Sequence, residues 1–244
     1  GRLLSFSGVV PVERANDTND PEGARQRNAS RLATLASNLA QGKDVLIFPE
    51  GSTHSDSDVR RVRPGAARIL LAAVREADSA GHPRPSVIPV GLHYSETQRF
   101  RERAAVVIER TMPFPAPPVL GEDLAEQDRL DRMWVDEVTA LFAAELQRVN
   151  HAKTSWAERT LIWRGRSLVY AEKQRLAGDD LTKPSFSASV MAARRLRAGW
   201  EFMAEHRPEE THRLAERCRH HFAELEDRGI TPYDVDARPE RLPP

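Results

Sequence analysis

The sequence contains few of the residues that several kinds of site require. It has a single cysteine, Cys218, which excludes an internal disulfide and argues against a thiolate-rich zinc or iron–sulfur site. Lysine plus arginine and aspartate plus glutamate each number 36, so no net charge attracts nucleic acid or anionic lipid, and any phosphate site has to be local. Every uncharged stretch is well short of the ~20 residues of a membrane-spanning helix. We therefore expect no such helix in this chain.

Several enzyme fingerprints are also missing. The sequence shows no P-loop, no dinucleotide-binding glycine pattern and no nucleophile elbow. Its 244 residues, of which 40% are hydrophobic, still suffice to bury the core of one large domain or two small ones.

Residues 1–120 alternate between strand and helix patterns, which is typical of an α/β layered domain. Short apolar segments bounded by glycine, proline or charge predict strands at residues 8–12, 44–48, 86–94 and 104–109. One helix is predicted to begin after Asp20, with Pro21 in its first turn, and to stop by Gly42. A second is predicted from Gly65 to residue 80, with Ile69, Leu70, Ala73 and Val74 as its buried stripe and Gly81 at its end.

A proline-rich segment, residues 112–118, separates this part from a helical remainder. Residues 123–150 predict an amphipathic helix, and helical patterns continue to Leu225 with interruptions at residues 178–184 and at Pro208. The fold class is therefore predicted to be α/β, a layered sheet with flanking helices, followed by a mostly helical C-terminal region. The predicted boundaries are residues 1–120 for the α/β part, 121–228 for the helical region and 229–244 for a loose tail.

The most informative segment follows the predicted strand at residues 44–48. Pro49 ends strand pairing, and Glu50 and Gly51 begin a polar turn where glycine allows the backbone to approach a ligand closely. Arg63 precedes Gly65 at the predicted start of a helix, where free amides favour an anion. This combination suits a phosphate, although a strand that ends in Pro-Glu-Gly also fits an ordinary turn.

Three blocks, in this order and spacing, resemble those of the glycerol-phosphate acyltransferase superfamily. They are Gly-Val-Val-Pro-Val-Glu-Arg over residues 8–14, Phe-Pro-Glu-Gly over residues 48–51 and Val-Ile-Pro-Val-Gly-Leu over residues 87–92. A Ser-Thr-His sequence over residues 52–54, and a basic residue before Gly-Ala-Ala-Arg over residues 65–68, resemble the glycerol-3-phosphate acyltransferase-like subgroup. The resemblance covers roughly residues 1–115.

The resemblance implies roles for the matching positions. Arg14 corresponds to the arginine that binds the phosphate of the acyl acceptor, and Arg63 to a second basic position. Pro89 corresponds to a block that shapes the acyl pocket. Because residues 52–54 replace the Thr-Arg common in the wider superfamily, the identity of the acceptor stays open. The implied acceptor-binding residues are Arg14, Glu50, Gly51, Ser52, Thr53, His54 and Arg63.

The catalytic pair of the family, His-x-x-x-x-Asp, does not occur in these residues. None of the eight histidines is followed by aspartate five positions on, and His54 has Asp58 four positions on. In the family the imidazole deprotonates the acceptor hydroxyl and the carboxylate orients the imidazole. The resemblance implies that the pair lies upstream of Gly1, so that residues 1–120 are the C-terminal portion of an acyltransferase domain.

The implied activity is transfer of a fatty acyl group from a thioester of coenzyme A or acyl carrier protein to a hydroxyl of glycerol 3-phosphate or lysophosphatidic acid, in phospholipid biosynthesis. The resemblance implies no metal, no organic cofactor and no nucleic-acid partner. It implies a membrane-associated protein on the cytoplasmic side, in contact with membrane lipid, and leaves the oligomeric state open. The alternatives are a non-catalytic module that binds lipid or phosphate and a helical scaffold for a partner protein.

Other polar groups have structural interpretations as well as functional ones. His93, next to Tyr94 at a strand end, is expected to be structural. One cluster, which fits a solvated helix face better than an incomplete metal site, consists of His212, Cys218, His220, His221 and Glu224. Another, which fits either a solvated face or contact with anionic lipid headgroups, consists of Arg194, Arg195, Arg197, Trp200 and Phe202.

Overall fold

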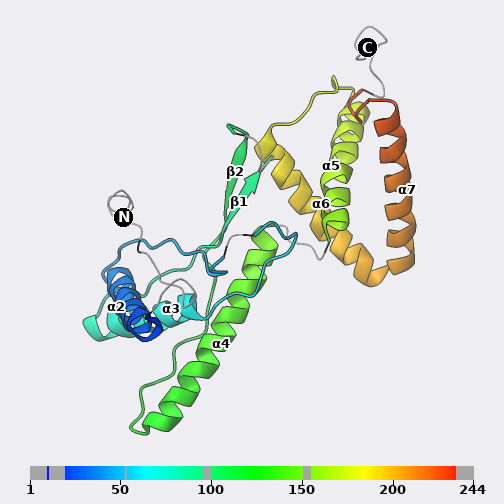
Figure 1. Cartoon of the computed structure of the whole chain (residues 1–244). Coiled ribbons are helices and arrows are strands. Elements are labelled where there is room, and N and C mark those ends of the chain that lie inside the picture. The colour runs from blue at the N-terminus through cyan, green and yellow to red at the C-terminus, as the bar shows by residue number, and fades with distance from the viewer. Residues whose placement is uncertain (1–9, 11–19, 53, 96–99, 151–154, 235–244) are drawn as a thin grey trace. The chain divides into compact units, whose positions relative to one another are not determined.

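The computed structural model of the chain describes residues 10, 20–52, 54–95, 100–150 and 155–234. The chain divides into two compact units (Figure 1). The first consists of Gly1–His54, Arg60–Pro89 and Arg110–Glu145, and the second of Ser55–Val59, Val90–Glu109 and Leu146–Pro244. Neither unit is continuous in sequence, because the chain passes between them several times.

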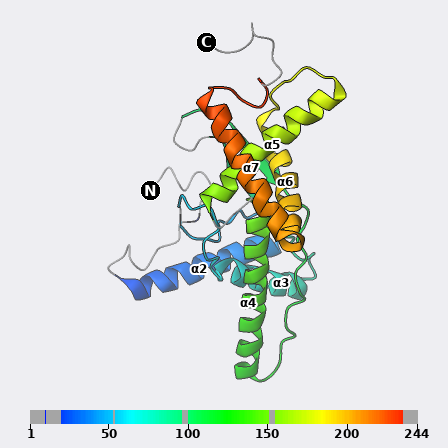
Figure 2. The same cartoon turned by 90° about the vertical axis from the view of Figure 1, so that its right-hand side faces the viewer.

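In the first unit, helices α2 (Pro21–Ala40) and α3 (Gly65–Ala80) pack side by side (Figure 1 and Figure 2). Asp20 caps α2 as predicted, because its carboxylate accepts a 2.9 Å hydrogen bond from the Gly23 amide. Gly81 ends α3 in the left-handed conformation at φ 67°. The buried stripe of α3 includes the four predicted residues, Ile69, Leu70, Ala73 and Val74.

Helix α4 (Leu124–Val149) is the amphipathic helix predicted from residues 123–150. The part of α4 up to Glu145 belongs to the first unit, where the buried Trp134 and Val138 pack with Leu70 and Val74 of α3. The indole N–H of Trp134 also donates to the carbonyl of Pro115 at 3.0 Å. The proline-rich segment is therefore a loop fastened to α4.

The strand predicted at residues 44–48 is not formed, so this prediction was wrong. Ile47 packs against the core of α2 and α3, whereas Leu46 and Phe48 are 75% and 68% exposed. The segment thus keeps the side-chain alternation of a strand, but no described residue pairs with it in a ladder, and a strand exists only through such pairing. The strand predicted at residues 8–12 lies outside the described residues apart from Val10, which is in no strand.

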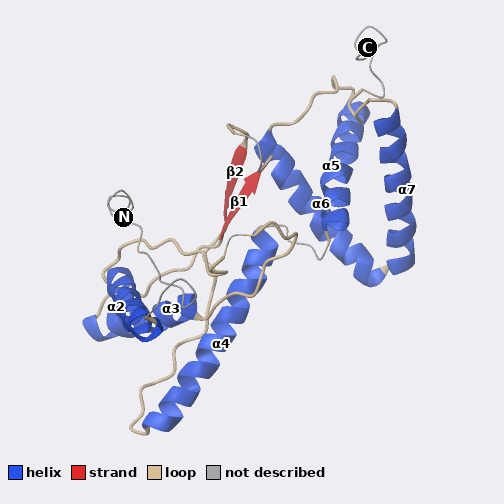
Figure 3. Cartoon of the chain, viewed as in Figure 1, coloured by secondary structure: helices blue, strands red, loops and turns tan. Residues whose placement is uncertain are grey.

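The second unit contains a two-stranded antiparallel sheet of β1 (Val90–Tyr94) and β2 (Ala104–Ile108), drawn in red in Figure 3. Its register pairs Leu92 with Val106, which confirms the strand predicted at residues 104–109 and the second half of that predicted at 86–94. Val87 makes only an isolated bridge to Met112. This small sheet is compatible with the predicted α/β class, while the predicted layered sheet is not confirmed.

Three helices complete the second unit: α5 (Trp156–Ala177), α6 (Phe186–His206) and α7 (Pro208–Asp227). The interruptions fall where they were predicted, since Gly178 ends α5 at φ 74° and Pro208 begins α7. The region is therefore helical as predicted, and the domain boundaries stay predictions; residues 235–244 of the predicted tail lie outside the described residues. The buried cluster of these helices contains Leu161, Ala215, Phe222 and Leu225.

Candidate functional site

The candidate site begins at a tight turn over residues 48–51. The amide of Gly51 donates to the carbonyl of Phe48 at 3.2 Å, and Gly51 has φ 65°, a conformation that favours glycine. Pro49 stands at the second position of the turn, where its restricted φ is favourable. The turn therefore follows from the Phe-Pro-Glu-Gly sequence itself.

Two donors hold the Glu50 carboxylate, and both reach the same oxygen. Nε2 of His54 lies 2.6 Å from Oε2, and the backbone amide of Arg60 donates to Oε2 at 2.8 Å. The side chains of His54 and Glu50 are 11% and 24% exposed. The other oxygen, Oε1, makes no hydrogen bond with the described residues and is not buried. The carboxylate is thus held in place with one oxygen left for a ligand.

Arg63 lies next to this turn. Its amide donates to the carbonyl of Pro49 at 2.8 Å, and its Cγ is 3.6 Å from the position that a Cβ would take on Gly51. Its side chain is exposed and forms no ion pair within the described part of the chain. Pro64 follows at the start of α3, which has no side-chain cap. An exposed guanidinium beside uncapped helix amides suits an anion such as a phosphate.

The structure thus gathers four of the predicted residues, Glu50, Gly51, His54 and Arg63, in the first unit. The Arg60 amide belongs to the same group and was not predicted. A backbone donor cannot be predicted from the residue type, because every residue except proline has a backbone N–H. The only signal for the contact between His54 and Glu50 is their spacing of four positions.

Two further predicted site residues, Ser52 and Pro89, make none of these contacts. Ser52 is exposed just after the turn, and Pro89 is buried directly before β1. Arg14 and Thr53 lie outside the described residues. The roles that the resemblance implies for all these residues stay predictions.

His93 is structural, as expected, and caps the end of α4. Its Nε2 lies 3.1 Å from the carbonyl oxygen of Val149, and the residue is 8% exposed. Burial lowers the pKa of the His93 imidazole, the bond to Val149 opposes this in part, and the charge of Arg159 adds to the lowering. Arg197 donates to the carbonyl of Gln147 at 2.8 Å. Two basic side chains therefore satisfy carbonyls that the end of a helix leaves without partners.

Two of the three histidines of α7 form exposed pairs along the helix. Nε2 of His212 lies 3.3 Å from Glu216, and Nε2 of His220 lies 3.5 Å from Glu224. Within the residues that the structure describes, no three histidine, cysteine, aspartate or glutamate side chains are grouped so that they could hold a metal ion.

The arginines of α6 are divided between the interior of the second unit and its surface. Arg194 pairs with Glu109, which also contacts Arg148. Burial by itself raises the pKa of Glu109, but the hydrogen bonds and charges of these two arginines outweigh it, so the pKa lies below its usual value. Arg195 remains exposed. None of the described helices combines the length and apolar character needed to cross a bilayer.

Comparison with known proteins shows what this part of the chain is similar to. Residues 1–93 match the family model described as Acyltransferase, and this range contains the Glu50 turn and Arg63. The chain is also similar to glycerol-3-phosphate O-acyltransferase 2 of Saccharomyces cerevisiae, with 30% identity over 125 residues. These matches confirm the resemblance of this part of the chain to the glycerol-phosphate acyltransferase superfamily.

The extent of the similarity is limited. The aligned residues make up 51% of this chain and 16% of the yeast protein, so the chain spans a small fraction of that relative. No solved structure matches the chain significantly.

Proposed function

We propose that this chain belongs to an enzyme that transfers a fatty acyl group from a thioester of coenzyme A or acyl carrier protein to a hydroxyl of glycerol 3-phosphate or lysophosphatidic acid. The proposal rests on one observation: the residues that match the family model contain the Glu50 turn. Within the matched residues the Glu50 carboxylate is held through Oε2, its Oε1 makes no hydrogen bond with the described residues, and the exposed Arg63 lies beside the turn. The name of the yeast relative supports glycerol 3-phosphate as the acceptor.

The two charges of the site suit the two ends of such an acceptor. Arg63, together with Arg14, binds the phosphate, because a guanidinium presents two parallel N–H donors to phosphate oxygens. Oε1 of Glu50 accepts a hydrogen bond from the acceptor hydroxyl and orients it toward the thioester carbonyl. Ser52, Thr53 and His54 complete the acceptor side, and positioning supplies much of the rate.

The remaining parts of the proposal come from the resemblance. The histidine of the family pair takes the hydroxyl proton as the acyl group moves and the thiol of the carrier leaves. The resemblance implies no metal or organic cofactor for this step. Pro89 helps to shape the acyl pocket. The product of this reaction, and one of its two candidate acceptors, are lipids. The protein therefore acts in phospholipid biosynthesis at the cytoplasmic side of a membrane, in contact with the membrane lipid.

The test uses the complete natural protein, glycerol 3-phosphate or lysophosphatidic acid, and a labelled acyl thioester of either carrier. Glu50→Gln is expected to lower kcat about tenfold or more, because it removes the charge that the two donors hold. Arg63→Ala is expected to raise the KM for the acceptor about tenfold with a smaller change in kcat, since a phosphate contact is shared by ground and transition states.

The matched control is Arg61→Ala, two positions away, because Arg61 is exposed and forms no ion pair with the described residues. Its kinetic constants should equal those of the wild type. A wild-type protein that binds glycerol 3-phosphate without transferring an acyl group would contradict the enzymatic proposal and favour the non-catalytic binding module.

A further inference from the structure

We infer that His54 is a positioning residue: together with the Arg60 amide it fixes the Glu50 carboxylate so that Oε1 is presented to the acceptor hydroxyl. The inference rests on the acyl-transfer function proposed above and extends it to the way in which His54 acts on the acceptor side. Its starting point is that the 2.6 Å contact of His54 and the 2.8 Å contact of the Arg60 amide both end on Oε2.

Two donors on one oxygen restrict the carboxylate more than one donor does. The last torsion of a glutamate side chain is broad and roughly two-fold, so an unrestrained carboxylate exchanges its two oxygens. A single hydrogen bond allows the group to swing about the bonded oxygen, whereas two donors in different directions fix its plane. Oε2 is then fully used, and Oε1 is the oxygen left for a ligand.

The surroundings of His54 suit this role. Its side chain is 11% exposed, so water competes little for the contact, and an imidazole N–H that donates to a carboxylate forms a charge-assisted bond. The Arg60 amide is fixed by the backbone, but His54 is a side chain that can be replaced. Of the two donors, His54 is therefore the one that a substitution can remove without altering the main chain.

The experiment compares His54→Gln with His54→Asn in the complete natural protein. The amide nitrogen of glutamine occupies the position of the imidazole Nε2 and reaches Oε2, whereas that of asparagine corresponds to Nδ1 and falls short. His54→Asn is expected to lower kcat about tenfold or more while the KM for the acyl thioester stays unchanged, since a small displacement of a positioning group has a large effect on rate. His54→Gln should keep kcat within about threefold of the wild type.

Equal kcat values for the two variants would overturn the inference, because a role in packing alone does not depend on where the amide lies. Thermal unfolding of both variants shows whether a loss of activity reflects loss of the fold.

A second measurement separates this inference from the proposed function. If the wild-type protein transfers no acyl group, the proposed function fails, and long-range proton–nitrogen NMR spectra of the wild type still test the contact. The spectra should show that Nε2 of His54 carries a proton. The resonance of this nitrogen should shift in the Glu50→Ala variant. An Nε2 without a proton, or a resonance that does not move, overturns the inference.

Discussion

At the scale of single residues, Arg75 and Asp131 connect α3 to α4 within the first unit. The guanidinium donates to both carboxylate oxygens at 2.6 and 2.5 Å, and each side chain is 24% exposed. Gln127 donates to Asp131 as well, at 2.7 Å. The hydrogen bonds from Arg75 lower the pKa of the Asp131 carboxyl, against the opposing effect of burial. The pair is therefore bidentate and, unlike the exposed pairs of the same helix, partly shielded from solvent.

Asp131→Asn is expected to lower the free energy of unfolding by about 1–3 kcal/mol at pH 7, because Arg75 loses its charged partner. Since the pKa of Asp131 is lower in the folded than in the unfolded chain, its stabilisation is complete above the unfolded pKa of about 4 and disappears as the pH falls through the folded pKa. Urea unfolding at pH 7 and at pH 3 should show the difference from wild type shrink at the lower pH.

The control for this prediction is Asp128→Asn, because Asp128 forms an exposed pair with Arg132 on the same helix. It should change stability by less than about 0.5 kcal/mol. Equal effects of the two substitutions, or a difference that does not depend on pH, would contradict the role of the pair between Arg75 and Asp131.

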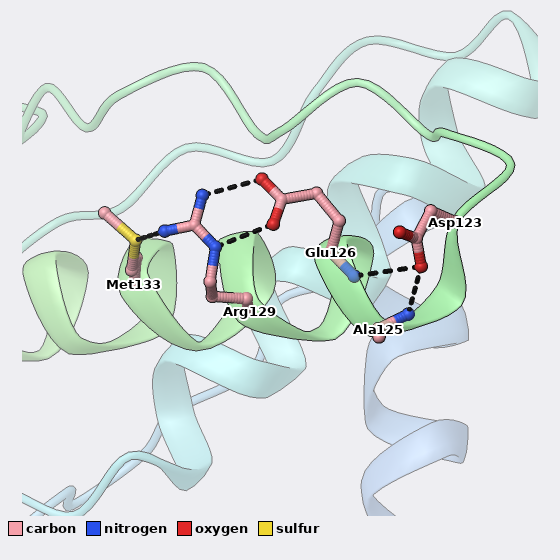
Figure 4. Close-up of polar contacts among 5 residues, drawn as sticks. All are labelled: Asp123, Ala125, Glu126, Arg129 and Met133. Carbon is pink, nitrogen blue, oxygen red and sulfur yellow. Dashed lines mark hydrogen bonds and ion pairs between the residues drawn. The ribbon is translucent and has the colours of Figure 1, made fainter.

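At the scale of elements, α4 is capped at both of its ends by groups outside the helix. At the first turn, Oδ1 of Asp123 accepts from the amides of Ala125 and Glu126 at 2.9 and 3.3 Å (Figure 4). Along the same face, Arg129 donates to both oxygens of Glu126 at 2.7 and 2.6 Å and contacts the sulfur of Met133 at 3.3 Å. The last carbonyls of the helix accept from His93 and Arg197, as described above.

Asp123→Ala is expected to cost about 1 kcal/mol of stability, because two amides of the first turn lose their acceptor and the helix loses a negative charge near its N-terminus. Asp123→Ser should restore most of that stability, since a hydroxyl oxygen can cap the same amides. Chemical unfolding followed by circular dichroism measures both. Alanine and serine variants of equal stability would show that the cap contributes nothing measurable.

At the scale of the whole molecule, the proposed function requires two arginines far apart in sequence to hold one phosphate. Arg63 lies beside the Glu50 turn, and the resemblance assigns the same ligand to Arg14. Two contacts to a single phosphate should be coupled, because the loss of one alters how the ligand sits on the other.

Arg14→Ala is therefore expected to raise the KM for glycerol 3-phosphate and to leave the KM for the acyl thioester unchanged. In the variant that carries both Arg14→Ala and Arg63→Ala, the fold increase in this KM should differ from the product of the fold increases in the two single variants. Steady-state kinetics of the complete protein measure all three variants. An unchanged KM would remove Arg14 from the site, and effects that simply multiply would mean that the two arginines do not share a phosphate.

Most of the predictions from sequence that held depend on neighbouring residues. The caps of α2 and α3, the breaks between the C-terminal helices and the turn at Gly51 are set within a few positions by steric limits and local hydrogen bonds. Glu50 and Arg63 were also chosen as candidates from the residues that flank them, and their roles stay predictions. The prediction of a strand at residues 44–48 was wrong, because the alternation of apolar residues reports which side is buried and not whether a second strand lies alongside.

The sequence by itself thus determined where most helices begin and end, the turn that carries Glu50 and the family resemblance of the first part of the chain. Only the tertiary structure decided which groups meet: His54 and the Arg60 amide on a single oxygen of Glu50, Arg63 beside Gly51, and His93 on the last turn of α4. These contacts join residues through loops whose path depends on packing, and residue types along the chain do not encode such distances.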